Sequence, residues 1–483
     1  MSSQQATQAR PAATEGFAAF LQENGLLVTV LGAFAIVLVV ALRKDLVVDG
    51  WMGLLSGRWI AHHGLPSHDT LTVWTHGRRW TDQQWLAQLG LYGLWRIGGI
   101  KLALLVHALL VTSGIAGASL IARTRGASAL SVTYVAIPVL VAYYPVASVM
   151  RPQSFAFPLF VATLWLVLTD ARHPSRRVYL TLPLLVLWTN LHGSVLLGTM
   201  LVSLAGLVAM VQQRRPTGRG LTLLLAPWAC LFASPYALHL PSYYDKILIG
   251  GHFKKFVTEW APTTLTPGTA AVYLLVLGGL WVLGRAGRSA PLLDQLAFAL
   301  TAVLAFEAVR NTAWVGLVAL AVLPPLVDRL RGPVQDPPSM NRILAITVVA
   351  TAAISVAAVS VKPVAWFTTK FPPAAAEAAA TAAGPDGRVF ATSPYADWLL
   401  WSQPKLAGRV AFDARFELLS TSQLHRVALL QARSGDWLRT VSGYRVFVLD
   451  AHSDGPLERS LIHRLPARVV FSSPQVVVLR RRG

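Results

Sequence analysis

The sequence predicts an α-helical polytopic membrane protein with about eleven transmembrane helices and a small C-terminal extracytoplasmic α/β domain. The composition, the spacing of the apolar runs and a change of pattern near residue 363 all support this class. Of the 483 residues, 54% are hydrophobic and 13% are charged, and the mean hydropathy is +0.52. Soluble chains carry about 25% charged residues. This chain has too few charges for the surfaces of several soluble domains, which excludes a soluble enzyme and a disordered chain.

The chain carries 42 Lys and Arg against 22 Asp and Glu, which gives a net charge of +20. The basic residues cluster in short loops between apolar runs. They are therefore expected to fix the topology and to contact anionic lipid headgroups, and no nucleic-acid partner is expected. Cys230 is the only cysteine and lies inside an apolar run, so no intrachain disulfide is possible.

The apolar runs predict the individual spans, because a helix needs about 20 apolar residues to cross a bilayer. The runs that fit this length are 25–42, 102–122, 129–145, 154–169, 178–190, 194–212, 220–238, 269–284, 291–308, 312–328 and 342–361. Residues 1–24 are expected to form a cytoplasmic tail. The run 25–42 lacks a small-residue cleavage site, which favours a retained first span over a signal peptide. We expect residues 25–362 to form one transmembrane domain.

The distribution of arginine between the spans predicts the orientation. Alternate short loops are rich in arginine, namely Arg123, Arg125, Arg172, Arg176, Arg177, Arg214, Arg215, Arg219, Arg285, Arg288, Arg329, Arg331 and Arg342. The other short connections carry only Arg151 and Arg310. Since cytoplasmic loops are enriched in Lys and Arg, the sequence predicts a cytoplasmic N-terminus and an outer C-terminus.

Three longer segments then face outward, at 43–101, 239–268 and 363–483. The first has Trp and Tyr at helical spacing within 50–63 and 82–97, which predicts two amphipathic helices on the membrane surface. The third alternates strand-like and helical runs, which predicts an α/β domain. Its expected helices are 374–383, 421–432 and 456–465, and its expected strands are 388–391, 409–412, 444–449, 468–471 and 476–479.

Polar residues at the outer ends of the spans are the candidate site, because the topology places them on one side of the membrane. They are Asp49, Asp69, Asp82, Arg151, Gln153, Asn190, His192, Glu259, Trp260, Glu307, Arg310 and Asn311. The sequence has no Gly-rich phosphate loop, no His/Cys cluster at metal spacing and no Gly-x-Ser-x-Gly motif. Arginine holds phosphate through its planar fork, and a carboxylate can accept a proton from a hydroxyl. This combination predicts a substrate with a phosphate, a polar headgroup and a lipid tail.

Several segments resemble bacterial GT-C-type glycosyltransferases, which are polytopic enzymes that use polyprenyl-phosphate sugars. The similar segments are VVDGWMGLLSGRWIAHHGLPSHDTLT, GRRWTDQQWLAQLGLYGLWRIGG, MRPQSFAFPLF, WTNLHGSVLLG, SPYALHL, TEWAP, RNTAWVGLVALAVLP, RVFATSPYADWLLW and VAFDARFE. Their order covers most of the chain from residue 26. The resemblance implies a bundle of eleven to thirteen spans in the bacterial cytoplasmic membrane.

The family's acid near the end of the first span matches Asp49, and Asp45 is the less favoured match. The resemblance implies that Asp49 is a general base toward an acceptor hydroxyl or part of a metal site, with a divalent cation as the one cofactor suggested. Two positions depart from the family pattern. Asp49 is followed by Gly50 where relatives often have a second acid, and Gly53 stands where many have His. Both departures leave the metal dependence open.

Several of these candidates also have a structural alternative. Asp49 could cap a helix over 50–62, since Asp is a preferred N-cap residue. Arg151 could reach to the interface from the end of a span, and Glu307 with Arg310 could form an i,i+3 ion pair.

The same holds for residues in the loops and the tail. Asp69 could cap a turn after Pro66, and His192 could bond backbone groups at a tight reversal. Asp413 and Arg415 are expected to form a structural pair in the C-terminal tail. Most tryptophans are expected in an interfacial belt.

The function favoured by these observations is transfer of a sugar from a polyprenyl-phosphate donor to an extracytoplasmic lipid, glycan or protein acceptor. Expected partners are the lipid-linked donor, membrane lipids and the acceptor. A surface-polysaccharide polymerase or ligase shares these features. A transporter is disfavoured because the span centres are apolar and no internal repeat is visible, and a non-catalytic assembly protein is a further alternative.

Overall fold

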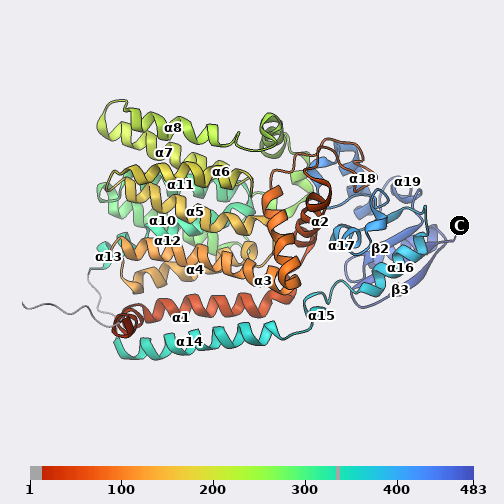
Figure 1. Ribbon diagram of the computed structural model, residues 1–483, viewed down its shortest axis with the longest axis horizontal. Coiled ribbons are helices and arrows are strands. Elements are labelled where there is room, and N and C mark those ends of the chain that lie inside the picture. The colour runs from red at the N-terminus through yellow and green to blue at the C-terminus, as the bar shows by residue number, and fades with distance from the viewer. Residues whose placement is uncertain (1–12, 333–337, 483) are drawn as a thin grey trace, which may run out of the picture.

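The structure is a computed structural model that describes residues 13–332 and 338–482. It consists of a bundle of long helices with a small sheet and several short helices at one end, where the C-terminus also lies (Figure 1). The bundle helices are α1 (Ala13–Asp45), α3 (Trp85–Thr124), α4 (Ala129–Ala147), α5 (Ala156–Asp170), α6 (Thr181–Thr189), α7 (Val195–Gln213), α8 (Gly218–Cys230), α10 (Ala270–Ala286), α11 (Leu292–Glu307), α12 (Thr312–Val322), α13 (Pro324–Arg331) and α14 (Pro338–Ser360).

The helix lengths confirm the polytopic class but not the number of spans. Among the described residues, seven helices are long and apolar enough to cross a membrane, or eight if α12 and α13, bent by 46°, form one span. Helices α6, α8 and α11 overlap predicted spans but contain only 9, 13 and 16 residues. The predicted count of about eleven is therefore not confirmed.

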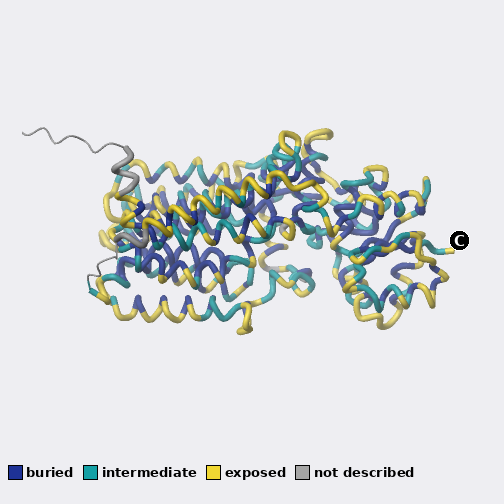
Figure 2. The backbone as a smooth tube through the Cα atoms, turned by 90° about the horizontal axis from the view of Figure 1, so that it is seen from below, coloured by how far each residue is buried: buried dark blue, intermediate teal, exposed yellow. Residues whose placement is uncertain are grey.

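The outer faces of the bundle are apolar, as expected for contact with lipid. Large hydrophobic side chains such as Leu109, Leu274 and Ile354 are 66–68% exposed on helices of the bundle. Buried residues lie in the middle of the bundle and in the sheet (Figure 2). Every residue of α12 is buried, which fits a helix that is apolar on all sides and surrounded by other helices.

The arginine-rich connections lie together at the end of the bundle away from the sheet, where Figure 1 shows α13 and the connection between α7 and α8. Arg125 pairs there with Asp294, and Arg219 pairs with Asp170. The Ser128 side chain bonds Asp328 at 2.6 Å. The loops that the arginine pattern places on one side of the membrane therefore lie at one end of the bundle. That this end faces the cytoplasm stays a prediction.

The first outer segment, 43–101, packs against other parts of the protein. Helix α2 (Val48–His63) matches the predicted 50–63, and 82–97 becomes the start of α3, which is kinked at Gly98 and Gly99. Gly99 has φ +66°, a conformation that favours glycine. Trp51 of α2 is 6% exposed and packs edge-on against Phe371 at 5.3 Å. The Trp51 side of α2 thus packs against other protein segments, and the position of this helix relative to the membrane surface stays a prediction.

The C-terminal part contains α16 (Pro373–Ala383), β1 (Val389–Ala391), α17 (Ser393–Ser402), α18 (Thr421–Ala432), α19 (Trp437–Val441), β2 (Val446–Asp450), α20 (Gly455–Arg464), β3 (Ala467–Ser472) and β4 (Val476–Arg481). The sheet order is β1-β2-β4-β3, with β1 parallel to β2 and the other pairs antiparallel. Successive residues of β2 point to opposite faces, as in any strand. Val446 and Val448 contact the apolar cluster that includes α16, whereas Phe447 and Leu449 contact the cluster that includes α18.

The predicted strand 409–412 is wrong, because this segment forms only isolated bridges. Val410 bridges Val389 of β1 on one side and Thr72 of the first outer segment on the other. The backbone N–H groups of Val73 and Trp74 donate to the carbonyls of Val410 and Ala411 at 2.8 and 3.0 Å. The first outer segment and the C-terminal part are thereby joined through backbone hydrogen bonds.

Helix α2 crosses α3 at Gly57, and this contact provides a test of the packing. A Cβ atom at Gly57 would lie 2.1 Å from the backbone oxygen of Gln88. We expect Gly57→Ala to lower the stability of the protein by about 1–3 kcal/mol, because the backbones must separate. Thermal unfolding of the purified full chain measures this effect. The matched control is Gly93→Ala on α3, where no heavy atom lies within 4 Å; equal melting of both variants would contradict the crossing.

Candidate functional site

A cavity of about 540 Å³ lies where the bundle meets the C-terminal part. Its lining comes from the starts of α2 and α3, the segments around 149–153 and 192–200, the segment 243–260, the turn before α12, and residues 414–417. Eight of the predicted site residues line it: Asp49, Arg151, Gln153, His192, Glu259, Trp260, Arg310 and Asn311. Helices far apart in sequence thus bring these side chains to one place.

Four of these residues form a chain of ion pairs. Arg151 Nη1 lies 2.5 Å from Glu259 Oε2 and 3.7 Å from Asp49 Oδ2. Arg310 Nη1 lies 3.3 Å from the other oxygen of Glu259. The Arg310 guanidinium also lies 4.2 Å above the Trp260 ring, which adds a cation–π contact. Glu259 therefore bridges two arginines that come from different parts of the chain.

Short turns fix these side chains. Arg151 is in extended conformation directly before the 3-10 turn Pro152–Phe155, and a proline at the first turn position favours that start. Glu259 lies in the turn Thr258–Trp260, and Arg310 lies in the turn Val309–Asn311. The Val309 N–H donates to the Ala261 carbonyl at 3.1 Å, which holds the second and third turns against each other.

The electrostatics of the site distinguish Asp49 from Glu259. Burial raises the pKa of Glu259, but Arg310 and Arg151 outweigh burial and lower it to about 2. Burial raises the pKa of Asp49 above its usual value, and Arg151 only partly offsets this shift. The Asp49 side chain lines the cavity and is 40% exposed, so it is only partly buried. Glu259 is thus a fixed anion, whereas Asp49 is the carboxylate suited to accept a proton.

Three structural alternatives from the sequence are wrong. Helix α2 begins at Val48 with Val47 as N-cap, so Asp49 lies in the first turn and does not cap the helix. Arg151 is 8% exposed and ion-paired, so it does not extend to an interface. Glu307 is exposed, and Arg310 pairs with Glu259 in its place.

Two residues of the turn before α7 differ in role. Asn190 accepts from Trp85 Nε1 at 2.9 Å and donates to the Val186 and Ala233 carbonyls, and it does not line the cavity. These hydrogen bonds join the turn to α3 and to the segment after α8. His192 lines the cavity, and its Nδ1 accepts from the Ser194 N–H at 3.1 Å, as the structural alternative expected. Burial and the two arginines lower the pKa of His192 well below its usual value, so the ring is neutral.

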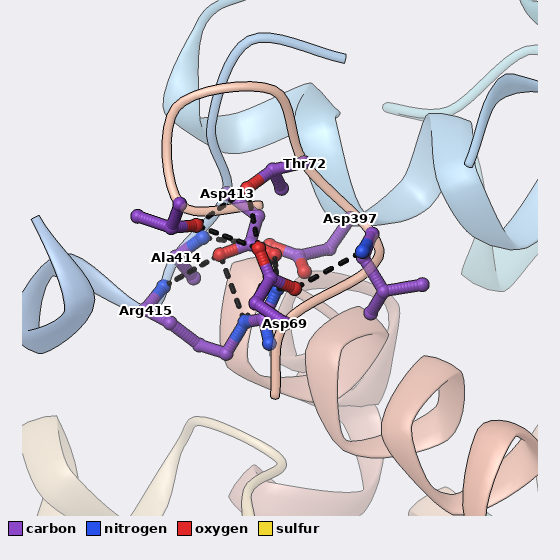
Figure 3. A network of polar contacts seen from close by, with 8 residues as sticks. Asp69, Thr72, Asp397, Asp413, Ala414 and Arg415 are labelled. Atoms are coloured by element: carbon purple, nitrogen blue, oxygen red, sulfur yellow. Dashed lines mark hydrogen bonds and ion pairs between the residues drawn. The ribbon is translucent and has the colours of Figure 1, made fainter. Parts of the chain in front are cut away.

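Asp69 and Asp82 lie outside the cavity lining. Asp69 accepts from the Leu71 N–H and the Thr72 and Thr75 hydroxyls, and pairs with Arg415 at 2.7 Å (Figure 3). This confirms its role in a turn and explains why it is buried. Burial raises the pKa of Asp82 to about 7.

Several residues that line the cavity are not among those predicted from the sequence. Gln83, Gln84 and Gln88 enter from the start of α3, Tyr243 and Tyr244 from α9 (Leu240–Tyr244), and Phe416 with Glu417 from the turn Phe416–Leu418. Tyr243 and Tyr244 belong to the second outer segment, 239–268. Its predicted position on the same side of the membrane as the candidate site was the available sign that they could reach the cavity. No spacing rule links Glu417 to residues more than 100 positions earlier in the chain.

The residues of this cavity do not fit a metal ion. Two of the carboxylates that line the cavity, Asp49 and Glu259, lie beside the same guanidinium of Arg151. Among the described residues, no group of three or more His, Cys, Asp or Glu is placed to hold a metal. The divalent cation suggested by the resemblance therefore has no matching donor set among the described residues.

The apolar bundle, the cavity at its end and the attached α/β part define a polytopic membrane protein with the GT-C fold. Solved structures with this arrangement include ArnT from Cupriavidus metallidurans bound to undecaprenyl phosphate, with 15% identity, 97% of this chain and 98% of that chain covered, and a TM-score of 0.53. The apo form of ArnT gives a TM-score of 0.54.

The oligosaccharyltransferase AglB from Archaeoglobus fulgidus, in complex with an inhibitory peptide and a dolichol-phosphate, is similar at 11% identity. The match covers 88% of this chain and 69% of that chain, with a TM-score of 0.51. The sequence matches no protein-family model and no curated protein. At these identities the likeness shows the fold.

Proposed function

We propose that the protein is a membrane glycosyltransferase that moves a sugar from a polyprenyl-phosphate donor to an extracytoplasmic lipid, glycan or protein acceptor. The observation that carries this proposal is the arginine pair, Arg151 and Arg310, held in one cavity beside the accessible carboxylate of Asp49. The lipid phosphates bound by ArnT and AglB support it. The membrane orientation proposed from the sequence places the cavity outside the cytoplasm, and residues 363–483 with it.

In this mechanism the arginines bind the donor phosphate. The donor is a phosphodiester with one negative charge, and the polyprenyl phosphate that leaves gains a second charge. Arg151 and Arg310 therefore stabilise the transition state more than the bound donor, which is the condition for catalysis. The phosphate competes with Glu259 for the two guanidiniums, and Glu259 holds them in position while the site is empty.

Asp49 acts on the acceptor. Its carboxylate takes the proton of an acceptor hydroxyl, whose oxygen forms a bond to the anomeric carbon while the bond from that carbon to the phosphate oxygen breaks. Attack from the face opposite the phosphate inverts the anomeric centre. The raised pKa of Asp49 brings its basicity closer to neutral pH, which suits a general base.

A surface-polysaccharide polymerase or ligase would use the same phosphate site with a longer donor. The transporter alternative is not favoured, because the buried centre of the bundle around α12 is apolar.

The arginine pair gives a direct test with undecaprenyl phosphate as the ligand. We expect Arg310→Gln and Arg151→Gln to weaken its binding by about 10–100-fold, the range for a hydrogen bond to a charged group. Binding to the purified full chain in detergent is measured by equilibrium titration. Arg96→Gln on α3, which is exposed, is the matched control and should bind as the wild type does. Unchanged affinity in both cavity variants would refute the phosphate site.

A further inference from the structure

One end of the sheet in the C-terminal part carries a cluster of arginines that has no part in the mechanism above. The arginine cluster consists of Arg388, Arg445, Arg468, Arg480, Arg481 and Arg482. The first two directly precede β1 and β2, the third is the second residue of β3, and the last three lie at or just after the end of β4. Ser393, two residues after β1, lines the cavity. The cavity and the arginine cluster therefore lie at opposite ends of β1.

The strand register brings these arginines side by side. The Arg445 N–H donates to the Arg388 carbonyl at 3.0 Å, and the Arg481 N–H donates to the Arg445 carbonyl at 2.9 Å. In the neighbouring row, Arg468 and Arg480 are direct partners on β3 and β4. Neighbouring strands lie about 4.8 Å apart, so the row of three arginines spans about 10 Å along the backbone. The positive charges are thus concentrated at one end of the sheet.

This charge has no counter-charge among the residues that the structure describes. None of the ion pairs includes a member of the arginine cluster, and Asp386, exposed in the turn before β1, makes none either. The pairing of Arg468 with Arg480 is unfavourable, because like charges directly opposite each other on adjacent strands are destabilising. A bound anion would remove this repulsion, since guanidinium forks bind carboxylate and phosphate groups.

The place of the arginine cluster in the molecule indicates the size and source of the anion. Strand β4 leads to the C-terminus, which lies at the end of the molecule away from the bundle in both views (Figures 1 and 2). Lipids around the bundle are therefore remote from this surface. Six guanidiniums are also more than a single small anion can contact, so the surface fits a chain that carries several anionic groups.

A protein partner is less well matched to this surface. The open edge of the sheet is β3, and its register shifts between Val469 and Phe471, which disrupts the pairing that an added strand needs. Among the described residues of the C-terminal part, no Phe, Trp or Tyr side chain is exposed. Protein interfaces depend on such aromatic anchors. Recognition at this surface therefore depends on charge.

We propose that the arginine cluster binds an anionic polysaccharide, a glycan chain that carries repeated carboxylate or phosphate groups. This rests on the proposed function, which makes a glycan outside the cytoplasm a molecule on which the protein acts. Each guanidinium donates to two oxygens of one anionic group. A chain bound here is held on the C-terminal part, while the cavity at the other end of β1 stays open to the lipid-linked donor.

Binding of defined polysaccharides to the full chain in neutral detergent tests this surface. The probes are polygalacturonate, which carries carboxylates, dextran phosphate, which carries phosphates, and neutral dextran. We expect at least one anionic polysaccharide to bind, with an affinity that falls as salt is added, and neutral dextran not to bind. Arg468→Gln combined with Arg480→Gln should weaken this binding by about 10–100-fold, because two charge-assisted contacts are lost.

The matched control removes the same net charge elsewhere on the C-terminal part. It combines Arg426→Gln with Arg433→Gln, at exposed positions in and after α18, and should bind as the wild type does. Equal affinity of the two double variants would overturn the proposal, as would failure of the wild type to bind either anionic polysaccharide. Arg388→Gln combined with Arg445→Gln provides a second test if the first double variant does not fold.

Two further probes separate this proposal from its neighbours. Tighter binding of poly-glutamate than of both anionic polysaccharides would assign the surface to an acidic protein and overturn the proposal. Undecaprenyl phosphate should bind the cluster variants as it binds the wild type, within twofold, because the cavity lies at the other end of β1. Failure of the wild type itself to bind undecaprenyl phosphate would overturn the proposed function, whereas loss of polysaccharide binding alone would not.

Discussion

Replacement of Asp49 by asparagine is expected to leave folding intact and to reduce sugar transfer by about 10²–10⁴-fold, the usual contribution of a general base. The structure removes the competing explanation, because Asp49 makes no capping bond at the start of α2. Asparagine has the same size but cannot accept the proton. Single-turnover transfer from a matched lipid donor measures the effect, alongside the melting temperature of the variant.

The pH dependence provides a second readout for Asp49. Because burial raises the pKa of this carboxyl, wild-type transfer should fall on acidification at a pH above the usual range of an aspartate. This acid limb should be absent in Asp49→Asn. Asp386→Asn, at an exposed position, is the control with wild-type transfer. Wild-type rates in Asp49→Asn would exclude Asp49 from the mechanism.

Replacement of Arg415 by methionine should destabilise the protein by about 3–5 kcal/mol, the cost of removing one partner from a buried ion pair. Arg415 is 2% exposed and joins Asp69 of the first outer segment to Asp413, and its guanidinium lies 4.2 Å above the Trp80 ring. The pKa of Asp397 beside them is raised well above its usual range by burial and by the Asp413 carboxylate (Figure 3). Without the arginine, carboxyl groups would face one another in a buried site.

The free energy of unfolding of the full chain and the rate of proteolytic cleavage in residues 64–80 measure the loss. Arg426→Met on α18, whose side chain is exposed, is the matched control and should change neither quantity. Equal stability of the Arg415 and Arg426 variants would show that the buried pairs do not hold the two segments together. Asp69→Asn should reduce transfer through this loss of stability, because Asp69 does not line the cavity.

The sequence predicts those cavity residues whose position follows from the order of the transmembrane helices. Alternating apolar runs place Asp49, Arg151 and Arg310 at the same end of the bundle, whatever the details of packing. The role of Asp69 depended on Arg415, which is 346 residues away, and no local pattern reports such a pair. Residues 409–412 have the composition of a strand. They form only two single β-bridges, from Val410 to Val389 and to Thr72, and no continuous ladder of paired residues.

The number of spans was less predictable for a different reason. Hydropathy gives the length of an apolar run. It does not show where glycine or proline kinks or divides the helix within that run. The run 102–122 continues back through the kink at Gly98 and Gly99, and the run 312–328 is divided into α12 and α13 at Pro324. Glu417 could not be found in this way at all, because it follows no apolar run.

The backbone bonds between residues 73–74 and 410–411 also constrain how the protein is made. Contacts this distant in sequence form late, since the intervening chain must first be synthesised and ordered. Residues 64–80 are therefore synthesised hundreds of residues before residues 410–411. They lack these backbone hydrogen bonds until that segment has followed. A chain released before residue 408 would carry most of its hydrophobic helices and yet lack residues 414–417, which line the cavity.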